Sequence, residues 1–110
     1  PGQTVCPYHY EHAEEEWLIV LEGSPTLRTP GGEEVLARGE VVCFPPGPAS
    51  AHKVSNASEE PARVLMFSEV VHPAISVYPA SAKVGVYTGG DRSDDRILRR
   101  EPNLEYFDGE

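Results

Sequence analysis

The sequence has little positive charge for its acidic content and no long apolar run. Nine Lys and Arg residues stand against 18 Asp and Glu residues, which gives a formal net charge of −9 at pH 7. This surplus of negative charge repels phosphate backbones and anionic lipid surfaces, so we expect no nucleic acid and no membrane among the partners. No stretch of about 18 apolar residues occurs, so no transmembrane helix is predicted.

Cysteine is also scarce. Cys6 and Cys43 are the only two, they form no CxxC pair, and a disulfide framework needs more. We therefore expect two reduced thiols in a cytoplasmic protein. The chain begins at Pro1 and shows no signal peptide, and we expect that strands preceding Pro1 are missing from it.

Length and turn-forming residues favour a single all-β domain. The chain has 110 residues, 39% of them hydrophobic, which suits one core. Proline (11) and glycine (10) interrupt the chain every few residues and leave room for short strands rather than long helices. Seven extended segments with β-branched or alternating residues predict an antiparallel sandwich or barrel: 5–11, 16–23, 26–29, 33–36, 41–44, 51–56 and 63–68.

The part of the chain after residue 71 has weaker strand patterns than the part before it. Segments 75–78 and 83–87 are weaker strand candidates, 89–95 is a polar loop, and 97–100 has a mixed pattern. We expect residues 1–71 to form the barrel core and residues 72–110 to complete the domain. The extended C-terminal tail is predicted to pack outside the barrel or against a second subunit, or to be disordered over its last ten residues.

Five side chains are candidate metal ligands, and four of them are close in the sequence. Imidazole together with carboxylate suits Mn, Fe, Ni, Co or Zn better than Mg or Ca. Strand alternation places Glu16 and His52 on apolar faces, where an unpaired charge is costly unless it meets a metal ion or a counter-charge. The candidates are His9, Glu11, His12, Glu16 and His52.

The spacing of two motifs resembles the cupin superfamily, in particular small bacterial single-domain cupins of unassigned activity. The end of the first cupin motif is matched by Glu16, six residues and Gly23. The second motif is matched, with a longer gap before the histidine, by Gly39, Pro45, Gly47, His52 and Asn56. The resemblance implies an antiparallel double-stranded β-helix, or jelly-roll barrel, with a bound divalent metal. It also implies isomerase, dioxygenase or decarboxylase chemistry.

The first cupin motif normally contributes a pair of histidines, and this chain departs from it. One alignment puts His9 and Glu11 at those positions, and the other puts Tyr10 and His12 there. A β-bulge would let His9 and His12 both reach the ion. The sequence leaves these three possibilities open.

The two faces of segment 16–23 suggest different roles. Trp17, Ile19 and Leu21 face away from Glu16, and such an apolar outer face predicts a homodimer. The interior wall reads as apolar, without an inward Lys or Arg, which favours an apolar, aromatic or small organic molecule over a sugar phosphate. Three functions follow: an enzyme, a module that binds a small ligand, or a metal-free structural barrel.

Overall fold

The computed structural model describes residues 1–110, which form ten short strands and two 3-10 turns joined by loops. The first seven strands are β1 (Tyr10–Glu11), β2 (Glu16–Glu22), β3 (Thr26–Thr29), β4 (Gly32–Val35), β5 (Val41–Phe44), β6 (Lys53–Ser55) and β7 (Arg63–Ser68). The remaining strands are β8 (Ala74–Tyr78), β9 (Lys83–Tyr87) and β10 (Arg96–Arg99). Two single 3-10 turns are η1 (Pro48–Ser50) and η2 (Pro79–Ser81). No helix has the length and apolarity needed to cross a bilayer.

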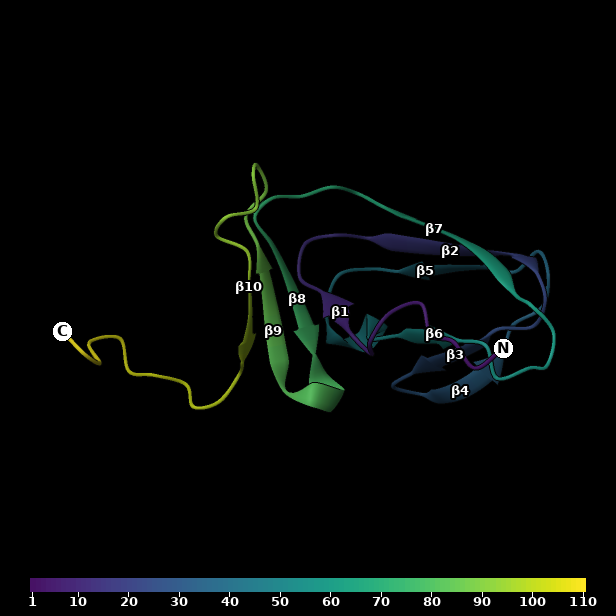
Figure 1. Cartoon of the computed structure of the whole chain (residues 1–110), viewed down its shortest axis with the longest axis horizontal. Helices are drawn as coiled ribbons and strands as arrows, with labels where there is room; N and C mark the ends of the chain where they lie inside the picture. The colour runs from purple at the N-terminus through teal and green to yellow at the C-terminus, as the bar shows by residue number, and fades with distance from the viewer.

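Two three-stranded antiparallel sheets face each other in the body of the molecule (Figure 1). One has the order β5-β2-β7 and the other β4-β3-β6. A third sheet, β1-β8-β9-β10, lies across one end of this pair. The arrangement is the predicted jelly-roll barrel, and the third sheet covers the end of the barrel that lies away from the N-terminus (Figure 1).

The core lies between the two facing sheets. Leu18 and Val20 alternate with the outward-facing Trp17, Ile19 and Leu21 along β2, as the sequence pattern predicts. Removing these branched side chains from water is the main stabilisation of the barrel. The buried cluster comprises Leu18, Val20, Leu27, Leu36, Phe44 and Val54, with Val42, Val64 and Met66 packed against it.

Strand register brings distant residues of the site together. His9 and His52 form an isolated antiparallel bridge, in which each backbone N–H donates to the other's carbonyl, at 3.0 and 2.8 Å. In β2, Glu16 lies opposite Phe44 of β5. In the end sheet, Glu11 of β1 lies opposite Ser76 of β8. Three pairings therefore place His9, Glu11, Glu16 and His52 at the same end of the barrel.

The C-terminal part contains one strand that the sequence pattern does not predict. Segment 96–99 forms β10 against β9, although all four of its residues are exposed and its pattern is mixed. Pairing with β9 supplies its backbone hydrogen bonds, so no apolar face is needed. Beyond β10 the chain runs away from the body with every residue exposed (Figure 1). This last part of the tail covers no surface of its own chain.

Candidate metal centre and adjoining cavity

Two histidine rings are held in place by backbone carbonyls. The Nδ1 of His9 lies 2.8 Å from the carbonyl oxygen of Pro7, and the Nδ1 of His52 lies 2.9 Å from that of Ser50. A carbonyl can only accept, so each Nδ1 carries the proton and donates. This arrangement leaves each Nε2 without a proton and free to accept or to ligate, as second-shell hydrogen bonds do for metal-ligating histidines.

Both Nε2 atoms approach the same carboxylate oxygen. Oε1 of Glu16 lies 3.3 Å from Nε2 of His9 and 3.9 Å from Nε2 of His52. Oε1 of Glu11 lies 3.6 Å from Nε2 of His9. His9, Glu11 and Glu16 therefore bring one ligand atom each to a region in which these atoms lie within 4.8 Å of one another.

His52 contains a polar atom without a partner. Its Nε2 is fully buried and makes no hydrogen bond, and the residue is 1% exposed. The ring stacks on Phe44, with 3.6 Å between centroids and 11° between planes, so it cannot easily turn toward another acceptor or donor. Leaving such an atom unsatisfied costs about 1–3 kcal/mol. A bound cation removes this cost, so the residues present fit a metal site.

The two imidazoles differ in their affinity for protons. Burial lowers the pKa of His9, but hydrogen bonding to Cys6, Glu16 and the Pro7 carbonyl outweighs burial and raises it to about 10. The hydrogen bond from His9 in turn lowers the pKa of Glu16. Burial lowers the pKa of His52, which is therefore neutral at pH 7. Without a metal, a second proton on His9 faces Glu16, and a cation would replace that proton.

The environment of Glu11 differs from that of Glu16 and has the opposite effect on the pKa. Burial raises its pKa above the ordinary value, although the hydroxyl of Ser76 donates to it and partly opposes the effect of burial. Glu11 also lines the cavity described below. A buried carboxylate with a raised pKa beside a cavity is suited to accepting and returning a proton.

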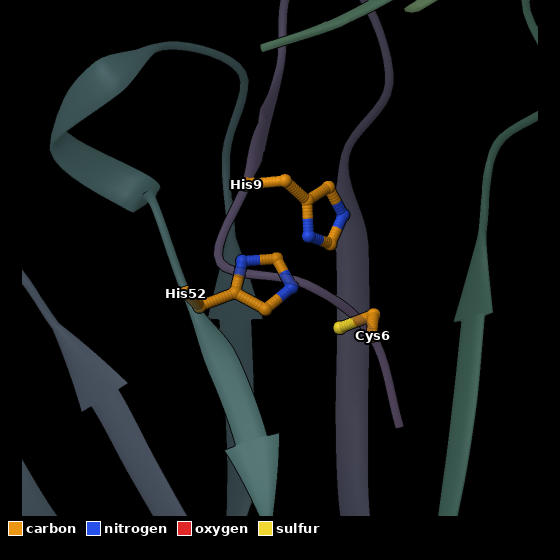
Figure 2. A group of neighbouring side chains, drawn as sticks. All are labelled: Cys6, His9 and His52. Atoms are coloured by element: carbon orange, nitrogen blue, oxygen red, sulfur yellow. The ribbon is translucent and has the colours of Figure 1, made fainter. Parts of the chain in front are cut away.

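Cys6 joins the cluster, although the sequence patterns did not single it out as a ligand. Its sulfur, one ring nitrogen of His9 and one ring nitrogen of His52 lie within 4.8 Å of one another. Figure 2 shows the sulfur and the two rings facing a common space. Cys6 lies before the first cupin motif, and the only sequence signal is its position three residues before His9 in an extended segment.

His12 lies outside the cluster. It is exposed, and its ring contacts the edge of Tyr10 at a centroid distance of 5.4 Å. Strand alternation at β1 explains the difference, because His9 and Glu11 point to one side and Tyr10 and His12 to the other. Among the five predicted ligands, the structure brings together His9, Glu11, Glu16 and His52.

A cavity of about 520 Å³ opens beside this cluster. Its wall is mostly polar, and it includes a cation, Arg92, from the loop after β9. The apolar interior wall that the sequence predicts is present, but its residues pack against one another as the core, and the cavity beside the cluster has a different and more polar lining. The cavity is lined by Cys6, Pro7, His9, Glu11, Glu14, His72, Ala74, Ser76, Tyr78, Tyr87, Gly89, Gly90, Arg92 and Asp95.

The loop between β9 and β10 is held by Asp95. The backbone N–H of Thr88 donates to Oδ1 of Asp95 at 2.8 Å, and Nε of Arg92 donates to Oδ2 at 2.8 Å. Below the loop, the hydroxyls of Tyr78 and Tyr87 lie 2.8 Å apart. Burial raises the pKa of Tyr78 well above its ordinary value, so this hydroxyl stays protonated as a hydrogen-bond donor.

Comparison with known proteins identifies the fold family. The family model for the cupin domain matches residues 1–68. A solved structure of a protein proposed to be a sugar phosphate isomerase, from Acidithiobacillus ferrooxidans, has a TM-score of 0.85 and 27% identity. That match covers 96% of this chain and 65% of the other, so the chain spans just under two thirds of that protein's length.

A second solved structure has the same fold. It is a sugar phosphate isomerase from the cupin superfamily of Silicibacter pomeroyi, with a TM-score of 0.85 and 22% identity. The match covers 98% of this chain and 67% of the other. No curated protein matches the chain. These matches confirm the predicted β-barrel.

Proposed function

The chain belongs to the cupin family, and on that premise we propose that it is a metal-dependent enzyme acting on a small, polar hydroxy-carbonyl compound. The proposed ligands of the metal ion are His9, Glu16 and His52. One observation carries the proposal: the buried Nε2 of His52 has no partner and lies beside Glu16 and His9, next to a polar cavity. The mixed imidazole and carboxylate set suits Mn, Fe, Ni, Co or Zn.

The cavity wall supports a reaction that moves a proton. A divalent ion at this position supplies a Lewis-acidic centre that polarises a bound oxygen. We assign Glu11 the role of the base, because burial raises its pKa and it faces the cavity, whereas Glu16 does not line it. Glu11 would take a proton from the hydroxyl-bearing carbon beside the carbonyl and return it to the carbonyl carbon, while the hydroxyl proton moves to the former carbonyl oxygen, which is an isomerisation.

Two further residues of the wall suit a polar substrate. The hydroxyl of Tyr78 remains protonated and can donate to a substrate oxygen. The guanidinium of Arg92 can pair with an anionic group at the other end of the substrate. The similarity to the Acidithiobacillus ferrooxidans protein, at 27% identity, supports a sugar or its phosphate ester as the first class of compound to test.

Metal content tests the first half of the proposal. Plasma mass spectrometry of the purified chain should find close to one Mn, Fe, Ni, Co or Zn ion per chain. His52→Ala should lose the ion, whereas His12→Ala should retain it, because His12 is exposed outside the cluster. Protein that takes up no metal even after incubation with each ion would instead be a metal-free structural barrel.

Proton exchange tests the second half. Metal-loaded protein is incubated in D₂O with a panel of aldoses, ketoses and their phosphate esters, and deuterium at the carbons next to the carbonyl is followed by NMR. We expect exchange in the wild type and its loss in Glu11→Gln with the metal content unchanged. Saturable binding of a panel member without exchange would make the chain a ligand-binding module and overturn the enzymatic role.

We also propose that two copies pair through the outer face of the β5-β2-β7 sheet. Exposed apolar side chains are gathered on this face, including Leu21, Val41, Leu65 and Phe67. Phe67 stacks on Trp17, with 6.4 Å between centroids and 5° between planes, which makes a flat aromatic surface. An apolar face of this kind is suited to a matching copy of itself, as in a two-fold dimer.

A further inference from the structure

We propose that the thiolate of Cys6 is a fourth ligand of the metal ion, which gives the centre a Cys, His, His, Glu donor set. This inference rests on the proposed metal site and adds a sulfur ligand to it. Sulfur changes the choice of metal, because thiolate binds Zn, Co and Fe(II) in preference to the hard ions Mg and Ca.

The distances support direct ligation. The Cys6 sulfur, one ring nitrogen of His9 and one of His52 lie within 4.8 Å of one another, and Figure 2 shows the three side chains around one space. With metal–sulfur and metal–nitrogen bonds of about 2.3 and 2.1 Å, the donor atoms of one tetrahedral ion lie roughly 3.4–3.7 Å apart. A shift of about 1 Å, mainly in the side chain of Cys6, therefore brings the three donors toward one ion.

The backbone on either side of Cys6 is anchored. On one side, the N–H of Val5 donates to the carbonyl of Val54 at 2.9 Å. On the other side, the bridge between His9 and His52 ties the chain to the same neighbouring segment. Cys6 is held between these two attachments while its own side chain stays half-buried at the cavity wall. The segment therefore presents the sulfur to the histidines without a cost in ordering the backbone on binding.

The unpartnered nitrogen of His52 is the independent observation that points to a ligand. This atom is buried and makes no hydrogen bond, and its residue belongs to the same cluster as the sulfur. A cysteine thiol offers only a weak donor, and no hydrogen bond joins it to His52. A cation bound between the two satisfies the nitrogen and takes up the charge of the thiolate, while the thiol proton leaves to solvent.

Cobalt substitution tests the sulfur ligand directly. Metal-free protein is loaded with Co(II), and absorption is recorded in the visible and near-ultraviolet ranges. We expect visible bands from ligated cobalt together with an intense thiolate-to-cobalt charge-transfer band. Cys6→Ser should lose the charge-transfer band and keep visible bands from the remaining ligands. Cys43→Ser is the matched control and should keep both, since Cys43 lies opposite Trp17 on the outer face of β2 and β5.

A competition experiment gives a second measure. The ratio of zinc to manganese affinity should fall by roughly tenfold or more in Cys6→Ser, since even outer-shell partners of a metal site cost 10–100-fold. The ratio should be unchanged in Cys43→Ser. Cobalt bound in the wild type without a charge-transfer band would overturn the role of Cys6 and leave the His and Glu site standing. Failure of the wild type to bind cobalt or zinc would overturn the proposed metal site itself.

Discussion

Ser76 donates its hydroxyl hydrogen bond to the carboxylate of Glu11, with Oγ 2.6 and 2.8 Å from the two carboxylate oxygens. The two residues are 65 positions apart, and only the pairing of β1 with β8 brings them together. Ser76 is itself buried, so the contact is shielded from water. The β1-β8-β9-β10 sheet thus fixes the position and the proton affinity of the Glu11 carboxylate, which we propose as the base.

Replacing Ser76 should change the pH dependence of the reaction. In Ser76→Ala, Glu11 loses a hydrogen bond that lowers its pKa, so its pKa should rise further. The acidic limb of the rate profile for deuterium exchange should move to higher pH, with the metal content unchanged. Ser81→Ala, in the exposed turn η2, is the control. An acidic limb at the same pH in Ser76→Ala and the wild type would contradict the assignment of Glu11 as the base.

The proton on His9 should stabilise the metal-free protein. Its pKa is about 10 in the fold against an ordinary value of 6.5, so the folded state binds the proton more tightly than the unfolded chain. The resulting stability is complete below pH 6.5 and is lost as the pH rises through 10. Thermal melts of metal-free protein should show a falling melting temperature between pH 7 and about pH 10.

Two variants isolate the source of this slope. His9→Gln should flatten that part of the pH profile, because it removes the titrating ring that faces Glu16. His12→Gln changes an exposed histidine outside the cluster and should retain the slope. Equal slopes in His9→Gln and the wild type would show that another group is responsible.

Gly23, which ends the first cupin motif, should not tolerate a side chain. Its φ is +77°, and a Cβ there would lie 2.5 Å from the carbonyl oxygen of Pro61 and 2.7 Å from Cα of Ala62. Both obstacles are backbone atoms, so Gly23→Ala should destabilise the fold by about 1–3 kcal/mol or more in urea unfolding. Gly31→Ala should stay within about 0.5 kcal/mol, because a Cβ there has only Thr29 at 3.6 Å.

The outer face of β2 and β7 should govern association. Sedimentation of the wild type should give a dimer, and Leu65→Lys should give a monomer because it places a charge in the middle of the proposed contact. Leu98→Lys changes an equally exposed leucine on β10 and should remain dimeric. Circular dichroism shows whether each variant keeps its fold. A monomeric wild type at micromolar concentration would exclude this interface.

Several strands could be predicted from the sequence because local rules determine them. β2, β3, β5 and β7 combine β-branched or alternating residues with Gly or Pro at their ends, and their predicted bounds agree with the structure to within one residue. β10 could not be predicted, since its exposed residues carry no apolar period and the strand exists only through pairing with β9. Pairing with another strand cannot be inferred from the residues of a short segment alone.

Some residues of the candidate site could likewise be predicted from the sequence, and others could not. Motif spacing singled out Glu16 and His52, and both lie in the cluster. Choosing between His9 and His12 requires the phase of the strand, which the bridge between His9 and His52 sets. Cys6 and Arg92 reach the cavity from segments far apart in the sequence, and neither belongs to a motif.

The origin of the cavity wall has an evolutionary consequence. Nine of its 14 lining residues, from His72 to Asp95, lie after residue 68, where the match to the cupin domain ends. The proposed metal ligands all lie before that residue. Changes in the hairpin of β8 and β9, or in the loop that Asp95 braces, can therefore diversify what enters the cavity without disturbing the residues around His52. In this protein, the scaffold that carries the proposed metal ligands and the residues that would set specificity therefore occupy separate parts of the chain.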